Sequence, residues 1–147
     1  MEVSPLIPSE NIRDIEVKAL ADAATNFISD QKWCRSVVSA HLAFAEPGII
    51  GIFLIRIVPA RSGVDDTLWV VVGDVPPAYL VCDDAPTWRE ALQSYIFEMD
   101  KWVGAVRSGA SLAEVIPVKA APTSEQAEML ASRLRFLREE ILGTDKE

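Results

Sequence analysis

The stretch IIGIFLIRIV, residues 49–58, carries no polar side chain except that of Arg56. It is rich in β-branched residues, and both its odd and its even positions are hydrophobic. A strand with this pattern normally lies inside a sheet that is covered on both faces. Residues 68–72, LWVVV, repeat the pattern. The two segments therefore predict central strands of one sheet, with a packing layer on each face.

Two further segments predict strands beside these. From Trp33 to Phe44 polar and apolar residues alternate, which predicts a half-buried strand. One face holds Val38, Ala40, Leu42 and Phe44, and the other holds Arg35, Ser39 and His41. The diproline at residues 76–77 predicts a turn, because proline cannot donate a hydrogen bond to a neighbouring strand. Residues 78–82 then predict a short fourth strand, antiparallel to the third.

Helix signals lie at both ends of the chain. Residues 9–28 predict a first helix whose apolar side chains recur near the helical period; they are Ile12, Ile15, Leu20, Ala24 and Phe27. The sequence TWRE, residues 87–90, matches a capping box at the start of a helix that runs to Gly109. Residues 111–114 predict a short helical turn. A last helix starts at Thr123, and its narrow apolar seam is typical of helices that pack side by side; the seam is Ala127, Leu130, Leu134, Leu137 and Ile141.

The order of these segments predicts the fold class. Contiguous strands joined by short turns, with helices only at the ends, indicate an α+β fold in a single domain of residues 1–147. We expect an N-terminal helix, a four-stranded antiparallel meander and two C-terminal amphipathic helices with a short helical turn between them. One helix, about 10 Å wide, cannot screen four strands spaced about 4.8 Å apart. We therefore also expect contact with a second copy of the chain, as a homodimer.

Charge and composition exclude several classes of partner. The net charge is −8, and residues 63–100 hold eight acidic residues and one basic residue. This balance disfavours binding to nucleic acid or to an anionic membrane, which need clustered lysine and arginine. It suits a protein partner with basic character, a cation or solubility alone. Residues 31–62 are the exception, with one acidic and four basic residues.

The sequence also suggests a location. Its longest apolar run is far shorter than the roughly 20 residues that a membrane helix needs, so we expect no membrane span. The amino terminus lacks the pattern of a secretion signal. Two cysteines, Cys34 and Cys82, make no disulfide framework and favour a reduced cytoplasmic setting of bacterial type.

The common catalytic motifs are missing. The sequence contains no glycine-rich phosphate loop, nucleophile elbow or zinc-protease helix, and it has one histidine. We therefore expect no metal centre, no cofactor and no catalytic residue. On a regular strand Cys34 and His41 point to opposite faces, so they cannot form a nucleophilic pair. His41 stays a candidate binding residue, because an imidazole can bind a ligand or exchange a proton.

Acidic residues cluster at the ends of the predicted strands. Asp65, Asp66, Asp83 and Asp84 fall at one end of the meander, and Asp74 falls at the other end beside the diproline. A metal site or an acid–base pair at the four-aspartate end is geometrically allowed. We favour the alternative that these residues form turns and that Asp83 and Asp84 help to start the following helix. Asp74, Asp83 and Asp84 stay candidate binding residues.

The aromatic residues fall into two groups. Trp69, Trp88 and Trp102 occupy positions that predict core packing. Trp33 and Tyr79 are less clearly internal and, with the diproline, are candidates for lining a groove that takes a peptide or a small ligand.

The run LWVVVGDVPPAYL, residues 68–80, continues into Asp83-Asp84-Ala85 and the amphipathic helix that contains Trp88. This pattern resembles one found in small bacterial proteins of unknown function. The resemblance covers about the carboxy-terminal half of the chain. It implies no activity and no role for any residue.

Three classes of function fit these observations. We favour a protein-interaction module, such as a small acidic adaptor, chaperone or immunity-type protein. The alternatives are a small-molecule-binding or hydrolytic domain with a pocket between sheet and helices, and a structural homo-oligomer.

Overall fold

The computed structural model describes residues 6–82, 85–113, 115–116, 118 and 120–143. The chain forms two compact units, Met1–Ala91 and Leu92–Glu147. The first unit holds a helix and the whole sheet, and the second is helical. The fold class is α+β, as predicted.

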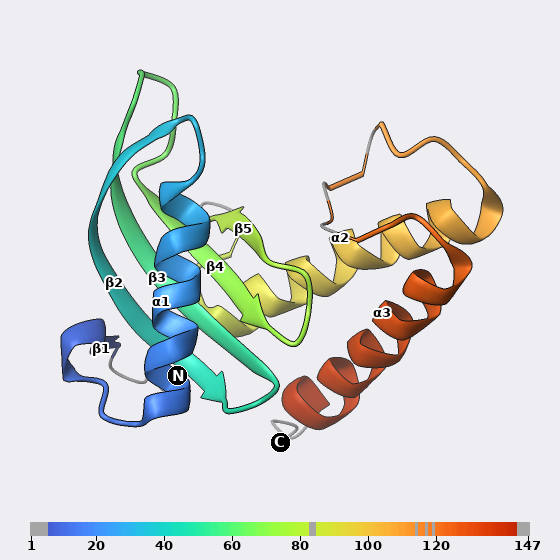
Figure 1. Ribbon diagram of the computed structural model, residues 1–147, viewed down its shortest axis with the longest axis horizontal. Helices are drawn as coiled ribbons and strands as arrows, with labels where there is room; N and C mark the ends of the chain where they lie inside the picture. The colour runs from blue at the N-terminus through green and yellow to red at the C-terminus, as the bar shows by residue number, and fades with distance from the viewer. Residues whose placement is uncertain (1–5, 83–84, 114, 117, 119, 144–147) are drawn as a thin grey trace. The chain divides into compact units, whose positions relative to one another are not determined.

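The sheet is antiparallel and has the strand order β1-β2-β3-β4-β5 (Figure 1). The strands are β1 (Ile7–Pro8), β2 (Cys34–Glu46), β3 (Ile50–Pro59), β4 (Thr67–Gly73) and β5 (Ala78–Val81). Four of them are the predicted meander. β1 is an additional strand that pairs only with His41 and Leu42 of β2. A two-residue strand containing a proline has no period that a sequence pattern can reveal.

Helix α1 (Ile15–Ser29) begins later than predicted. Asp14 caps it, because the Asp14 carboxylate accepts hydrogen bonds from the backbone N–H groups of Glu16 and Val17, at 2.9 and 3.1 Å. Residues 9–11 instead form a separate 3₁₀ turn, η1 (Ser9–Asn11). The prediction that Ile15 belongs to the buried face was wrong, since its side chain is 85% exposed. The buried residues of α1 are Val17, Ala21, Ala24 and Ile28.

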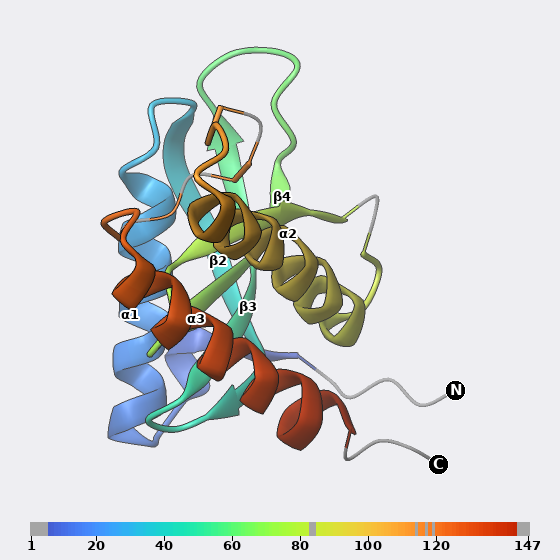
Figure 2. The ribbon, with the colours of Figure 1, turned by 90° about the vertical axis from the view of Figure 1, so that its right-hand side faces the viewer.

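Helix α1 lies across one face of the sheet, here called the α1 face (Figures 1 and 2). Its small side chains let it pack closely on alternate residues of the central strands. From β3 these are Phe53, Ile55 and Ile57, and from β4 they are Leu68, Val70 and Val72. The residues that alternate with these point to the opposite, second face, because side chains alternate along a strand; they include Ile52, Leu54 and Arg56 of β3 and Trp69 and Val71 of β4.

Strand β2 does not keep the single alternation that the sequence predicted. Its pairing with β3 shifts between Cys34 and Ser36, between Val37 and Ser39, and between Leu42 and Phe44. Each bulge adds a residue on one strand and turns the following side chains to the other face. Leu42 therefore pairs with Phe53 on the α1 face, whereas Phe44 pairs with Ile52 on the second face. The assignment of Val38, Ala40, Leu42 and Phe44 to one face was wrong for Phe44, and Val38 is the unpaired residue of a bulge.

The segment that enters helix α2 (Trp88–Ser108) contacts the second face of the sheet within the first unit. The indole Nε1–H of Trp69 donates a 2.6 Å hydrogen bond to the carbonyl oxygen of Ala85. The rings of Phe44 and Trp88 stack with centroids 4.3 Å apart. These two contacts hold the chain against the sheet where the helix begins.

Replacement of Trp69 by phenylalanine is expected to lower the free energy of unfolding by about 1–3 kcal/mol, because the Ala85 carbonyl loses its donor in a buried setting. Urea unfolding followed by circular dichroism measures the change. Trp33→Phe is the control, since no hydrogen bond of its indole is recorded and its ring contact with Tyr79 can persist. Equal effects of the two substitutions would contradict the role of the Trp69 hydrogen bond.

The second unit consists of α2 from Leu92 onward, α3 (Ser124–Phe136) and a π-helical extension, η3 (Leu137–Leu142). The predicted caps are present, since Thr87 Oγ1 accepts from the Glu90 N–H and Thr123 Oγ1 accepts from the Gln126 N–H, each at 3.2 Å. The predicted seam is buried along its whole length. Arg107 of α2 forms an ion pair with Glu128 of α3, and Asp100 of α2 forms one with Arg138 of η3. No helix among the described residues is long and apolar enough to cross a membrane.

The predicted turn at residues 111–114 is only partly within the described residues. The Ser111 hydroxyl accepts a hydrogen bond from the Ala113 N–H at 3.1 Å. Glu114 lies outside the described residues, so the predicted helical turn stays a prediction.

Candidate functional site

A hollow of about 210 Å³ opens on the second face of the sheet and is formed entirely by the first unit. Six residues line this sheet hollow: Leu6, Ser39, His41, Leu54, Arg56 and Thr67. The strand register explains why they meet. Ser39 and Thr67 flank Arg56 on the two neighbouring strands, and His41 pairs with Leu54. Paired residues share a face, so all five strand residues point to the same side.

Two features of the sequence place the Arg56 side chain in the sheet hollow beside Ser39 and His41. Arg56 is the one charged residue of β3 and faces away from α1, because its neighbours Ile55 and Ile57 occupy the α1 core. The bulge between Val37 and Ser39 then brings Ser39 beside Arg56. His41 lies two pairs further along and is therefore a diagonal neighbour of Arg56 on the same face, with Cα atoms about 7–8 Å apart.

The charge of Arg56 is not neutralised by an ion pair with any described residue. Within the described residues, neither Arg56 nor His41 has a recorded salt bridge or side-chain hydrogen bond. The carboxylate of Asp66, next to Thr67 in sequence, accepts a 3.0 Å hydrogen bond from the Thr67 hydroxyl. The sheet hollow therefore presents positive charge and hydrogen-bond donors to solvent.

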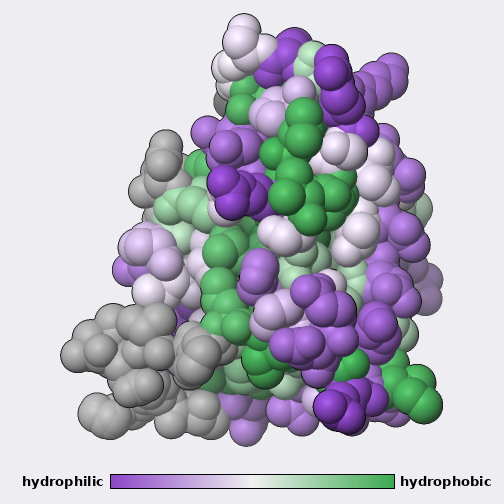
Figure 3. All heavy atoms as spheres, turned by 90° about the vertical axis from the view of Figure 1, so that its left-hand side faces the viewer, coloured by the Kyte–Doolittle hydropathy of each residue, from purple (hydrophilic) through white to green (hydrophobic). Residues whose placement is uncertain are grey.

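Exposed apolar side chains adjoin the sheet hollow. Val58 lies two residues beyond Arg56 on the same face of β3 and is 38% exposed, and Val38, in the bulge beside Ser39, is 57% exposed. We call these two residues the valine patch. Figure 3 shows hydrophobic atoms, in green, forming a stripe along this side of the molecule between hydrophilic flanks. The bulges at the same edge obstruct the regular pairing of another strand.

Two of the aromatic candidates meet on the other side of the sheet. The rings of Trp33 and Tyr79 are in edge contact with centroids 4.9 Å apart, and Phe27 of α1 lies 6.3 Å from Tyr79. Because the two rings are in contact with each other, they fill the space between Trp33 and Tyr79 where the groove was predicted. Tyr79 remains 38% exposed, so this cluster presents a ring to solvent.

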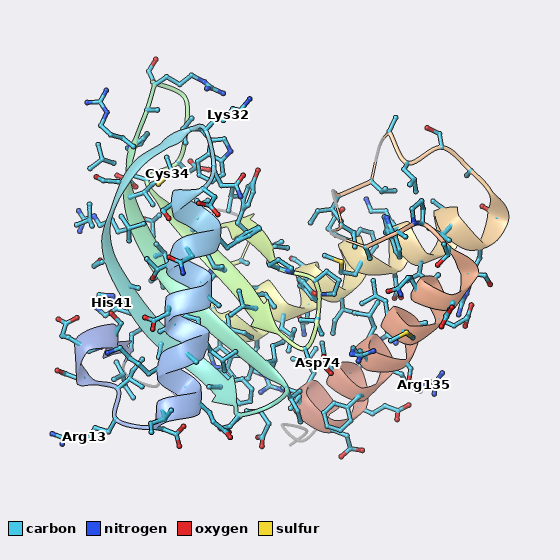
Figure 4. The ribbon with its side chains drawn as sticks, in the orientation of Figure 1. Arg13, Lys32, Cys34, His41, Asp74 and Arg135 are labelled. Carbon is cyan, nitrogen blue, oxygen red and sulfur yellow. The ribbon has the colours of Figure 1, made fainter. Side chains whose placement is uncertain are left out.

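Asp74, the acidic candidate that lies within the described residues, is not near His41 (Figure 4). Asp74 follows the last residue of β4, and its N–H donates a 2.9 Å hydrogen bond to the Ile49 carbonyl. Figure 4 shows His41 and Asp74 at well-separated positions on the sheet. Asp83 and Asp84 lie outside the described residues. Among the described residues, no group of three or more histidine, cysteine, aspartate and glutamate side chains is placed to hold a metal ion.

The two cysteines offer no nucleophile next to His41. Cys34 belongs to the core beneath α1, on the face opposite to His41, and burial raises the pKa of its thiol. Cys82 is half-buried at the end of the strand region. A raised thiol pKa lowers the fraction of reactive thiolate, so the structure provides no Cys34–His41 pair for nucleophilic chemistry.

Of the residues that line the sheet hollow, the sequence pattern singled out only His41. The interruption of residues 49–58 by Arg56 was the available signal for the others, since a charge on a central strand needs solvent or a partner. Ser39, Thr67 and Leu6 carried no signal, because their position depends on the register and on β1. The molecule is thus an α+β protein with a small cationic hollow on one sheet face. Comparison with protein-family models, curated proteins and solved structures finds no match to this chain.

Proposed function

We propose that this protein is a protein-interaction module whose docking surface is the sheet hollow together with the valine patch. The observation that carries the proposal is an arginine without an ion pair among the described residues, Arg56, that lies beside His41 in the sheet hollow and close to exposed valines. Its partner is a protein segment that combines acidic and apolar residues. The apolar residue covers the valine patch, and the acidic residue enters the sheet hollow.

Charge complementarity supports an acidic partner at this surface. The chain as a whole carries a net charge of −8, yet residues 31–62, which supply most of the docking surface, have a net charge of +3. A local reversal of sign steers an oppositely charged partner to one place and repels it from the rest of the surface.

The acidic residues in segment 63–100 suited a partner with basic character. In the structure Asp65 and Asp66 precede β4, whereas Asp74 follows its other end. These described acids of the first unit therefore make no single acidic surface. An acidic partner fits the docking surface better.

The size of the sheet hollow favours a side chain over a whole small molecule. Pockets for small ligands typically have volumes of about 300–1,000 Å³. The sheet hollow has about 210 Å³ and is open to solvent. It is large enough for one side chain of a docked segment, and the contacts outside it come from the valine patch. The predicted homodimer and the cytoplasmic location stay predictions.

A peptide library tests the proposed function. The full chain is immobilised and used to select from random linear peptides displayed on phage, and the selected peptides are titrated by fluorescence anisotropy. We expect enrichment of peptides that place aspartate or glutamate next to an apolar residue. Val38→Glu is expected to weaken their binding at least about tenfold, because it removes apolar contact and adds a repelling charge.

Ile15→Glu is the matched control, because Ile15 is also exposed but lies on α1, across the sheet. It makes the same change of charge and should leave peptide binding unaltered. A library that yields no enriched sequence, or peptides that bind the two variants equally, would overturn the proposal.

A further inference from the structure

We infer that the sheet hollow is an oxyanion site, which takes a carboxylate or a phosphate group through Arg56, His41 and Ser39. The inference deepens the proposed function, because in a docked protein segment the oxyanion is the carboxylate of an acidic residue. It also applies to a free anion, so the hollow itself can be tested without any partner.

The donors of the sheet hollow suit an oxyanion. The Arg56 guanidinium offers a planar fork of N–H groups that matches the two oxygens of a carboxylate or a phosphate. His41 adds a ring N–H, and Ser39, paired directly with Arg56, adds a hydroxyl. The Thr67 hydroxyl proton is directed to Asp66 Oδ1, so Thr67 shapes the wall and is not counted among the donors.

The setting of these donors strengthens their effect. Leu6 and Leu54 form apolar walls, which displace water and raise the strength of a charge-assisted hydrogen bond. Arg56 stands on β3, which is paired with β2 on one side and with β4 on the other. A strand held on both sides keeps the base of the guanidinium side chain in place, so less ordering is needed when an anion binds.

The charge of Asp66 allows an anion site to be distinguished from a cation site. Its carboxylate accepts a hydrogen bond from Thr67, which lines the sheet hollow, yet it forms no ion pair with Arg56. A fixed negative charge near the site repels an incoming anion and attracts a cation. Removing this charge must therefore strengthen anion binding if the sheet hollow is an oxyanion site, and must weaken binding if it is a cation site.

Small anions and a cation serve as probes. Acetate, inorganic phosphate and methylammonium are titrated separately into the full-length protein while the His41 ring and the Arg56 side-chain resonances are followed by NMR. We expect saturable shifts with acetate or phosphate and none with methylammonium. Asp66→Asn should tighten anion binding about two- to fivefold. Arg56→Gln should abolish the saturable shift of His41.

Two control variants change the same charges elsewhere. Asp22→Asn and Lys18→Gln are exposed substitutions on α1, across the sheet, and neither should alter the titrations. Thermal unfolding checks that Arg56→Gln folds, and His41→Gln, followed at the Arg56 resonance, gives an independent loss of anion affinity. A saturable response to acetate identifies a carboxylate ligand, and a response to phosphate alone identifies a phosphate ligand.

The results separate this inference from the proposed function. If no anion gives a saturable shift, or if Asp66→Asn weakens anion binding, the oxyanion site is refuted, and selected peptides that depend on Val38 would leave the interaction module standing. If anions bind as expected but no peptide is selected, the interaction module is refuted and the oxyanion site stands.

Discussion

Replacement of Phe53 by alanine is expected to lower the free energy of unfolding by about 3–5 kcal/mol, the range for a large buried aromatic side chain. Phe53 is fully buried in the core between α1 and the sheet. It stands on central strand β3, so the strands on both sides restrict the collapse of the cavity. Urea unfolding, followed by tryptophan fluorescence and circular dichroism, measures the loss.

Gly51 supplies a partner substitution that tests the cause. A Cβ atom on Gly51 would lie 2.8 Å from the Phe53 ring and 3.2 Å from Leu20 of α1. Gly51→Ala is therefore destabilising in the native chain, because the ring has no free space into which it can move. In the Phe53→Ala background the same methyl group enters the cavity, so the cost of Gly51→Ala should disappear or change sign.

This double-mutant cycle isolates the contact between the two positions. The control is Gly104→Ala, in the interior of α2, where no atom lies within 4 Å of the added Cβ. It should add stability equally in both backgrounds, by about 0.5–1 kcal/mol. Additive effects of Gly51→Ala and Phe53→Ala would show that the ring does not occupy the space above Gly51.

The sequence predicted the central strands because their signal is strong and does not depend on neighbours. Residues 49–58 and 68–72 are apolar on both faces, and only a covered strand satisfies that pattern. They form β3 and β4. The caps at Thr87 and Thr123 were equally local. A threonine followed three residues later by glutamate or glutamine is enough to predict such a cap.

The edge of the sheet was harder to predict because its geometry depends on pairing. Nothing in the alternation of residues 33–44 shows where β2 inserts an extra residue, and a single insertion moves Phe44 to the face opposite to Leu42. The same insertions decide that Ser39 and His41 share a face with Arg56. The strand register therefore brings the residues of the candidate site together. A sequence pattern can single out individual residues, but it does not show that they meet.

Gly73 gives the second large effect on stability. Its φ is +135°, a conformation that residues with a side chain rarely adopt, and an added Cβ would lie 2.8 Å from Ile50 Cα and still closer to the Ile49 carbonyl oxygen. Both are backbone atoms of the turn into β3, so no rotation of a side chain relieves the clash. Gly73→Ala is expected to cost about 2–5 kcal/mol, as backbone strain and displacement add.

Gly48→Ala separates the two causes. Gly48 also has a positive φ, +82°, but no atom lies within 4 Å of an added Cβ. Its substitution should therefore cost only about 1–2 kcal/mol, the penalty for a left-handed residue. The excess cost at Gly73 measures the close approach of β3 and the end of β4, where the Asp74 N–H donates to that same Ile49 carbonyl. Equal losses for the two alanine variants in urea unfolding would show that strain alone, without the clash, requires glycine at position 73.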